Sequence, residues 1–414
     1  MYRKLAVLGG CLLALVVATG RLQAQVPAAQ PAVAPGATRL AADQWYARQK
    51  RDRTLFYVAA PGNGSSLEDG GYGIMVFDRD NNWQFVKRIP LWDYPAWLGP
   101  GDFRGISAHA DTGRLYVSHN RGVAAFDLRT DKMLWHTDSL NTGNFDNGDC
   151  CENSHVTIDG KTIIAGSGGR KDRWWVLDAN SGRITGQIPT PDTMRPHNIV
   201  MSLDGTRMYL APNFNGLLSV LDTSTMKVIR TVGPTTGDTK TLTINGTGTR
   251  LYSTMTELLG FEILDIPSGK MIERVEVPGF GWNGRRFGHV TPSHGIALSP
   301  DEKEVWVVDG VEGQYFMHVF DNTITPKKLI ANVPTRRPAA WITFSIDGKY
   351  VYNSNGEVFD AATKNKIHQL VDEYGRLAGS EKSLEIVFEG DKVVRVGERY
   401  GAGQVRTAGA SNQR

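Results

Sequence analysis

Short apolar runs alternate with polar turns along most of the chain, most clearly in residues 195–233, RPHNIVMSLDGTRMYLAPNFNGLLSVLDTSTMKVIRTVG. Here two apolar runs flank an Asp-Gly turn, and a third run ending in Leu-Asp is followed by Thr-x-x-Met-Lys and a fourth run. Four short β-strands joined by tight turns fit this pattern. The β-branched and aromatic runs lack the 3.6-residue period of a helical repeat. Related units begin at Arg104, Glu152, Lys240, His294 and Ala340.

Two incomplete units remain, one near each end of the chain, and they complement each other. RTLFYVAAPG and YGIMVFDRDNNWQFVKRI supply strands two to four, and KSLEIVFEGDKVVRVGERYG supplies a first strand. Joining both ends of the chain in one sheet closes a ring and removes free sheet edges. The turn positions recur every 42 to 54 residues, as expected for one four-stranded blade per repeat; they are Asp111, Asp159, Asp204, Thr247, Asp301, Asp347 and Glu389. The sequence therefore predicts an all-β, seven-bladed β-propeller over residues 45–403, closed by a C-terminal strand.

The repeats resemble those of the YVTN-type β-propellers. PHNIVMSLDGTRMYLAPN and SHGIALSPDEKEVWVVDG are similar to that family's strand–turn–strand core, and LSVLDTSTMKVIRTVG to its third and fourth strands. The resemblance covers nearly all of residues 53–400. It implies an extracytoplasmic seven-bladed ring, a shape shared by binding or scaffold proteins, lactonase-like hydrolases and propeller subunits of quinoprotein amine dehydrogenases. Shared architecture does not transfer chemistry.

The N-terminal region predicts export. Arg3 and Lys4 precede an apolar run, and Leu22-Gln23-Ala24 offers a small-residue cleavage site, so residues 1–24 form a signal peptide. Residues 25–44 form an Ala/Pro-rich linker, and residues 404–414 a flexible tail. No later segment is apolar over the length that spans a bilayer. We expect a periplasmic or secreted protein, and a monomer.

The balance of charges excludes a bulk electrostatic attraction to nucleic acid. The chain has 46 basic and 43 acidic residues, and the three basic residues in excess, Arg3, Lys4 and Arg21, belong to the signal peptide. The mature chain is thus formally neutral. A neutral chain offers no bulk case for nucleic acid or anionic lipid as a partner.

Alignment of the repeats on their turns identifies the residue that opens the innermost strand of each blade. These strand-start residues are Arg104, Glu152, His197, Lys240, His294, Ala340 and Lys382. Six of the seven are ionisable, and a residue at this position can turn toward the central channel. One interpretation is that strand starts lie beside turns and are simply solvated. The other is a positively biased funnel that binds a small anionic molecule, or an acidic side chain of a partner protein.

The connections that lead into these strands emerge on one face of the ring and are rich in aromatic residues and glycine. The longest, residues 278–294, accounts for the widest repeat spacing, and long insertions on one face are a common place for ligand binding. Alternatively, these loops only cap the channel. The side chains expected to border the opening are Trp92, Trp97, Trp282, Arg285, Arg286 and His289.

Residues 144–155, NFDNGDCCENSH, combine two adjacent cysteines with carboxylates and a histidine. A divalent metal would need Asp149 and Glu152 to converge with His197 and His294, but the spacing matches no strong local signature. His155 lies inside the strand and on the opposite parity, so we expect it to pack or hydrogen-bond between blades.

Cys150 and Cys151 are the two cysteines left after cleavage, in a compartment where disulfides persist. Adjacent Cα atoms across a trans peptide lie about 3.8 Å apart, closer than the roughly 4.4–6.8 Å usual in disulfides. A disulfide that shapes the loop, two free thiols, and a redox or metal role all remain open.

Self-contained catalytic motifs are absent from the sequence. It has no Gly-x-Ser-x-Gly, no His-Glu-x-x-His, no phosphate-binding loop and no Cys-x-x-Cys-His. The sequence therefore favours an exported propeller that binds a small anionic ligand or a partner protein at the channel mouth. The alternative is a metal-assisted lactonase-like hydrolase, or the propeller subunit of an extracytoplasmic oxidoreductase.

Overall fold

The computed structural model describes residues 52–61, 69–92, 102–138, 150–167, 173–189, 195–213, 215–282, 284–285 and 291–406. The chain separates at residue 32, and every described element belongs to the second unit. The predicted signal peptide and linker lie outside the described residues. Among the described residues, no helix has the length and hydropathy needed to cross a membrane.

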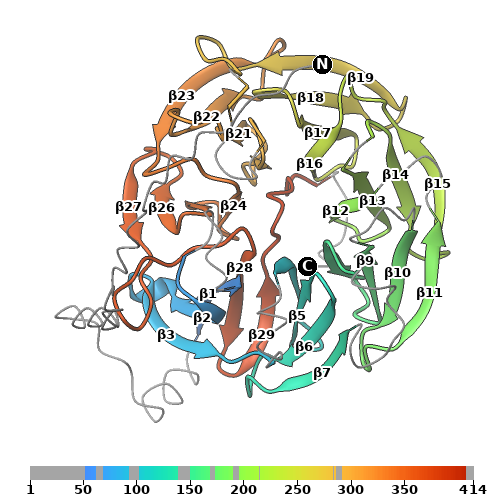
Figure 1. Ribbon diagram of the computed structural model, residues 1–414, viewed down its shortest axis with the longest axis vertical. Helices are drawn as coiled ribbons and strands as arrows, with labels where there is room; N and C mark the ends of the chain where they lie inside the picture. The colour runs from blue at the N-terminus through green and yellow to red at the C-terminus, as the bar shows by residue number, and fades with distance from the viewer. Residues whose placement is uncertain are drawn as a thin grey trace, which may run out of the picture. The chain divides into compact units, whose positions relative to one another are not determined.

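Seven antiparallel sheets follow one another around a central channel, which confirms the predicted seven-bladed β-propeller (Figure 1). The first sheet contains β1 (Arg53–Pro61), β2 (Tyr72–Asp78), the 3₁₀ turn η1 (Arg79–Asn81), β3 (Gln84–Ile89), β28 (Ser383–Glu389) and β29 (Lys392–Val396). The second contains β4 (Phe103–His109), β5 (Arg114–His119), β6 (Gly122–Asp127) and β7 (Met133–Asp138). The third contains β8 (Ser154–Val156), β9 (Thr162–Gly166), β10 (Arg173–Asp178) and β11 (Ile184–Pro189).

The remaining four sheets repeat the same order, with the first strand of each unit on the inside. The fourth contains β12 (Pro196–Met201), β13 (Arg207–Pro212), β14 (Leu218–Asp222) and β15 (Lys227–Val232). The fifth contains β16 (Thr239–Ile244), β17 (Arg250–Met255), β18 (Gly260–Asp265) and β19 (Lys270–Glu276). The sixth contains β20 (Ile296–Leu298), β21 (Glu304–Val308), β22 (Phe316–Asp321) and β23 (Lys328–Pro334). The seventh contains β24 (Ile342–Phe344), β25 (Tyr350–Asn353), β26 (Glu357–Asp360) and β27 (Lys366–Gln369).

The sequence signature of each unit has a local cause in its turns. In the fourth sheet, the hydroxyl of Ser202 donates to Asp204 Oδ1 at 2.6 Å, and the same oxygen accepts from the backbone N–H of Thr206. At the end of β14, Asp222 Oδ1 accepts from the hydroxyls of Ser224 and Thr225. Short polar side chains that hydrogen-bond to nearby backbone groups stabilise such turns and stop the strands from continuing. The Asp-Gly and Leu-Asp-Thr motifs therefore mark the corners of a blade.

The C-terminal part of the chain closes the ring with two strands, where the sequence predicts one. β28 pairs with β1 as expected, and β29 pairs with the other side of β28, so this sheet has five strands. Residues 397–406, the C-terminal segment, then run across the centre of the ring (Figure 1).

The C-terminal segment is hydrogen-bonded to three other blades. Leu298 N–H donates to Gly401 O at 2.8 Å, and Gly403 N–H donates to Ile244 O at 2.8 Å. Trp341 Nε1 donates to Arg399 O at 2.9 Å. Gly401 has a φ of +57°, and a Cβ atom there would collide with Ala297, so only glycine fits this crossing. The predicted tail, residues 404–414, begins inside this segment, where Gln404 N–H donates to Pro300 O at 3.0 Å. Residues 407–414 lie outside the described residues.

A buried carboxylate holds the closing sheet to the seventh sheet. Glu385 on β28 accepts from the hydroxyl of Tyr352 at 2.5 Å and from the backbone N–H of Ile346 at 2.8 Å. The guanidinium of Arg79 lies 3.4 Å away, and Glu385 is 1% exposed. We expect Glu385→Ala to lower the free energy of unfolding by about 3 kcal/mol, because it leaves buried donors without their acceptor.

Chemical denaturation of the purified protein measures this effect. Glu389→Ala, at an exposed position on the same strand, is the matched control and should change stability by less than about 0.5 kcal/mol. Equal stability of the two variants would show that Glu385 does not hold the ring closed.

Candidate functional site

A cavity of about 410 Å³ lies at the end of the channel where the inner strands begin. We call it the first chamber. All six ionisable strand-start residues line it, so the structure brings together residues that are far apart in the sequence. The complete lining is Asp102, Arg104, Glu152, Asn153, Arg195, His197, Asn198, Asn213, Lys240, His294, Trp341, Glu381, Lys382 and Arg399.

Irregular pairing of the inner strands aims three of these side chains into the chamber. The register of β4 shifts between Phe103 and Gly105, so that Arg104 is left out of the ladder. β12 shifts in the same way at His197, and the shift in β16 leaves out Lys240 together with Thr241. A bulge leaves its extra residue unpaired and turns that side chain away from the normal alternation. Arg104, His197 and Lys240 therefore line the chamber at positions that the ladder of each sheet leaves out.

Charges around the first chamber are positively biased, with five basic and three acidic side chains in its lining. Arg104 forms ion pairs with Asp102 at 2.8 Å and with Glu152 at 3.0 Å. Lys382 forms an ion pair with Glu381 at 3.0 Å. All three acids thus form ion pairs with two of the five basic residues, and the lining keeps an excess of two positive charges.

His197 is held as a neutral imidazole in the chamber wall. Its Nδ1 lies 2.9 Å from Lys240 O, and its Nε2 lies 3.4 Å from Glu152 Oε1. Burial lowers the pKa of His197 well below its ordinary value, and the positive charge of Lys240 lowers it further. His294, the other histidine of the lining, is 3% exposed and packs edge-on against Trp341.

Lys240 differs from Lys382, the other buried lysine among the described residues. Lys382 forms an ion pair with Glu381 at 3.0 Å. Among the described residues, no hydrogen bond or ion pair involves Nζ of Lys240, although this residue is only 8% exposed. Burial lowers the pKa of Lys240 to about 8, despite the opposing effects of Glu152 and Glu381.

Arg399, in the C-terminal segment, forms the floor of the first chamber and was missed by the sequence analysis. Its Nε donates to Glu381 O and its Nη1 to Arg104 O, both at 3.0 Å, and Nη1 also donates to Asn153 Oδ1. The guanidinium carbon lies 4.3 Å from the centre of the Trp341 ring. Arg399 is 4% exposed, and all these partners are neutral. The sequence offers one indication of its role, the pair Arg399-Tyr400 directly after the last strand. This pair lies outside the repeats, so the alignment of the repeats could not place it.

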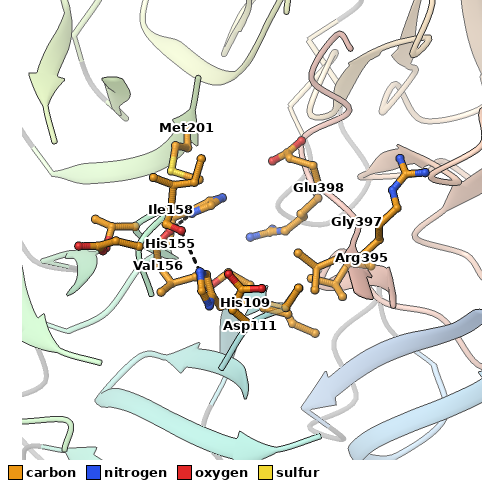
Figure 2. A pocket seen from close by; sticks show the side chains of 18 of the residues that line it. His109, Asp111, His155, Val156, Ile158, Met201, Arg395, Gly397 and Glu398 are labelled. Atoms are coloured by element: carbon orange, nitrogen blue, oxygen red, sulfur yellow. Dashed lines mark hydrogen bonds between the residues drawn. The ribbon is translucent and has the colours of Figure 1, made fainter. Parts of the chain in front are cut away.

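A second chamber of about 600 Å³ lies at the opposite end of the inner strands, because the end of β4 lines it while the start of β4 lines the first. Figure 2 shows His109, His155 and Met201 on one part of its wall and Arg395 and Glu398 on another. Arg399 contributes to both chambers and lies between them.

His155 lines the second chamber and is absent from the lining of the first. It is half-buried, and its Nδ1 donates to the backbone oxygen of the next residue, Val156, at 2.7 Å. That it packs or hydrogen-bonds between blades stays a prediction.

The aromatic and basic loop residues do not line the first chamber where the structure describes them. Trp92 stacks on His136 with ring centres 4.1 Å apart, inside the second sheet. Trp282 packs against a core cluster of the fifth and sixth sheets, and Arg285 O accepts from Glu312 N–H. Trp97, Arg286 and His289 lie outside the described residues.

The structure describes three of the four residues that were predicted as candidate metal ligands. Glu152, His197 and His294 line the first chamber, whereas Asp149 lies outside the described residues. Within the described part of the chain, no group of three or more His, Cys, Asp and Glu side chains could hold a metal ion.

Cys150 and Cys151 are joined by a disulfide, and both are fully buried. The peptide bond between them is cis and their Cα atoms are 3.0 Å apart, whereas the sequence argument assumed a trans peptide. We expect the peptide that contains both cysteines to take up no alkylating reagent without reductant, and two equivalents after reduction of the unfolded protein. Mass spectrometry of the digested protein measures this. Uptake by unreduced, unfolded protein would show free thiols.

Comparison with known proteins shows the fold. No family model matches the chain, and no curated protein matches it. Hydrazine synthase from Kuenenia stuttgartiensis is similar in structure, with a TM-score of 0.52 and 16% identity over 74% of this chain and 96% of that chain. A chain of a mitotic checkpoint complex has a TM-score of 0.56 and 11% identity over 78% of this chain and 93% of that chain. At these identities the likeness concerns architecture alone, so the comparisons identify the chain as a β-propeller and assign it no activity.

Proposed function

We propose that the protein binds a small anionic molecule in the first chamber, and that it does so as an exported propeller of the YVTN type. The volume of about 410 Å³ lies within the range of small-molecule sites. The excess of basic side chains supports an anion. Two of them, Lys240 on β16 and the floor residue Arg399, form no ion pair with an acidic side chain among the described residues.

The observation that carries this proposal is the ammonium group of Lys240, which forms no hydrogen bond or ion pair with the described residues. Burying a charged amine without a partner is costly, and proteins normally pair such a group or shift its pKa. Here the side chain lines an open cavity and makes no hydrogen bond or ion pair with the described residues. A carboxylate or phosphate oxygen in the chamber would supply the missing partner. Binding proteins and partner-binding scaffolds both use such propellers. A chamber of about 410 Å³ favours a small molecule over a single protein side chain.

The dependence of binding on pH tests the proposal. Lys240 has a pKa of about 8, below its ordinary value of 10.5, so its positive charge is present below about pH 8 and is lost above it. We expect the affinity for succinate, which stays a dianion over this range, to fall as the pH rises from 7 to 9.5. Isothermal titration calorimetry at constant ionic strength measures the change.

The same titrations with citrate and inorganic phosphate distinguish carboxylates from phosphates. Absence of binding by all three anions at pH 7 would contradict the proposed function. Binding that does not change between pH 7 and 9.5 would show that an anion binds without using Lys240.

A further inference from the structure

We infer that Lys240 forms an imine with the carbonyl group of an oxo acid bound in the first chamber. The inference rests on the proposed function, because the carboxylate of the oxo acid is the anion that the chamber binds. It adds a covalent step at one named atom, Nζ of Lys240, and narrows the ligand to molecules that carry both a carboxylate and an aldehyde or ketone.

The geometry places the Lys240 side chain in the wall of the first chamber. The bulge in β16 removes this residue from the strand ladder and places it in the chamber wall. Lys382, from another blade of the same chamber, has its Nζ 3.0 Å from Glu381 Oε2. A paired ammonium is held in its protonated form, which is not a nucleophile. Two lysines thus line one cavity, and only Lys240 lacks a partner among the described residues.

Desolvation supports the same assignment. A lysine becomes nucleophilic when burial or a neighbouring cation favours the neutral amine. Burial lowers the pKa of Lys240 to about 8, and Arg195 and Arg104 add to this effect, whereas Glu152 and Glu381 oppose it. A useful fraction of the amine is therefore uncharged near neutral pH. The other titratable or charged groups facing the chamber are Asp102, His197, His294, Lys382 and Arg399.

The reaction balances without an oxidant, a reductant or a cofactor. The neutral amine adds to the carbonyl carbon and gives a carbinolamine, which then loses its oxygen as water. Starting from the ammonium form, two of its three protons leave in that water and the third stays on nitrogen. The product is a protonated imine that keeps the positive charge of the lysine. Glu152 and Glu381, the carboxylates that act most strongly on Lys240, stabilise that charge.

The charges of the chamber favour a carbonyl compound that also carries a carboxylate. Arg104 and Arg399 both line the chamber, where Arg399 Nη1 donates to Arg104 O at 3.0 Å, and both carry guanidinium charges. A carboxylate attached to the carbonyl carbon is attracted by these charges and brings the carbonyl close to the amine. Positioning of this kind raises the rate of an otherwise bimolecular reaction.

Reductive trapping of the purified full-length protein tests the inference. Glyoxylate and sodium cyanoborohydride at pH 8 convert an imine into a stable N-carboxymethyl lysine, and peptide mass spectrometry gives the rate at each lysine. Lys303, an exposed lysine of the same molecule, is the internal reference. We expect Lys240 to be modified at least tenfold faster than Lys303 and Lys382, with a rate that rises through about pH 8. An excess of succinate should slow the reaction at Lys240 and leave Lys303 unaffected.

Succinate binding measured on the same sample separates the two proposals. Succinate binding together with modification of Lys240 no faster than that of Lys303 overturns the imine and leaves anion binding intact. Fast modification of Lys240 that succinate does not slow also contradicts the inference, because the ligand would then not be held as an acid. Absence of binding by succinate, citrate and phosphate alike contradicts the proposed function itself. Lys240→Arg should lose rapid glyoxylate uptake, because it lacks the amine that forms the imine. Lys303→Arg, on the exposed surface, should keep both succinate binding and the rapid modification of Lys240.

Discussion

Replacing Arg399 with methionine is expected to abolish anion binding and to lower the free energy of unfolding by on the order of 4 kcal/mol. The guanidinium donates to Glu381 O, Arg104 O and Asn153 Oδ1, and these buried acceptors lose their donor together in the variant. A neutral side chain also removes a positive charge from the floor of the first chamber. Chemical denaturation measures the first effect, and calorimetry with succinate measures the second.

Two further variants make this result interpretable. Arg395→Met removes the same charge from the neighbouring strand β29, outside the first chamber, and should leave succinate binding unchanged. Arg399→Lys keeps the charge but cannot reach three acceptors at once, so we expect it to restore part of the binding and little of the stability. A stable Arg399→Met protein that binds succinate normally would refute the assignment of Arg399 as the floor of the site.

Replacing Lys240 with methionine is expected to weaken succinate binding about 100-fold, corresponding to roughly 3 kcal/mol, the cost usual for removing one partner of a buried charge pair. The fall in affinity between pH 7 and 9.5 should disappear in the same variant, since the group that loses its charge in that range is gone. Stability at pH 7 should not decrease, because an unpaired buried charge is replaced by an apolar side chain of similar length.

Lys303→Met is the matched control, because it removes one positive charge from a side chain that is 69% exposed. It should change succinate affinity less than twofold and keep the dependence on pH. Equal effects of Lys240→Met and Lys303→Met would mean that net charge governs binding and that the chamber does not.

The fold, and the convergence of the strand-start residues around one cavity, could be predicted from the sequence because both depend on the repeat. A constant distance from the Asp-Gly turn to the start of the inner strand sets Glu152, His197 and Lys240 at one end of the channel. No single strand reveals this arrangement, since each contributes one side chain. The pairing of β28 with β1 could also be predicted. The first unit lacks an innermost strand, and the residues after the last complete unit supply one.

The pairing details and the C-terminal segment could not be predicted in the same way. The bulge at Lys240 depends on how β16 packs against its neighbours. The alternation of apolar residues along the sequence does not predict it. The segment after β29 is rich in glycine and has no strand pattern, so it was assigned in part to a flexible tail. Its hydrogen bonds to Leu298 and Trp341 exist only once the ring surrounds it. The loop residue Trp282 packs on the core because apolar burial outweighs exposure at the channel mouth.

The crossing of the ring by residues 397–406 has a consequence for the order of assembly. β28, β29 and Arg399 follow the strands of the other six sheets along the chain, yet they complete the first sheet and the lining of the first chamber. The second to seventh sheets draw on residues 103–369 alone. A chain cut after β27 would therefore keep the strands of six sheets but lose Glu381, Lys382 and Arg399 from the chamber wall.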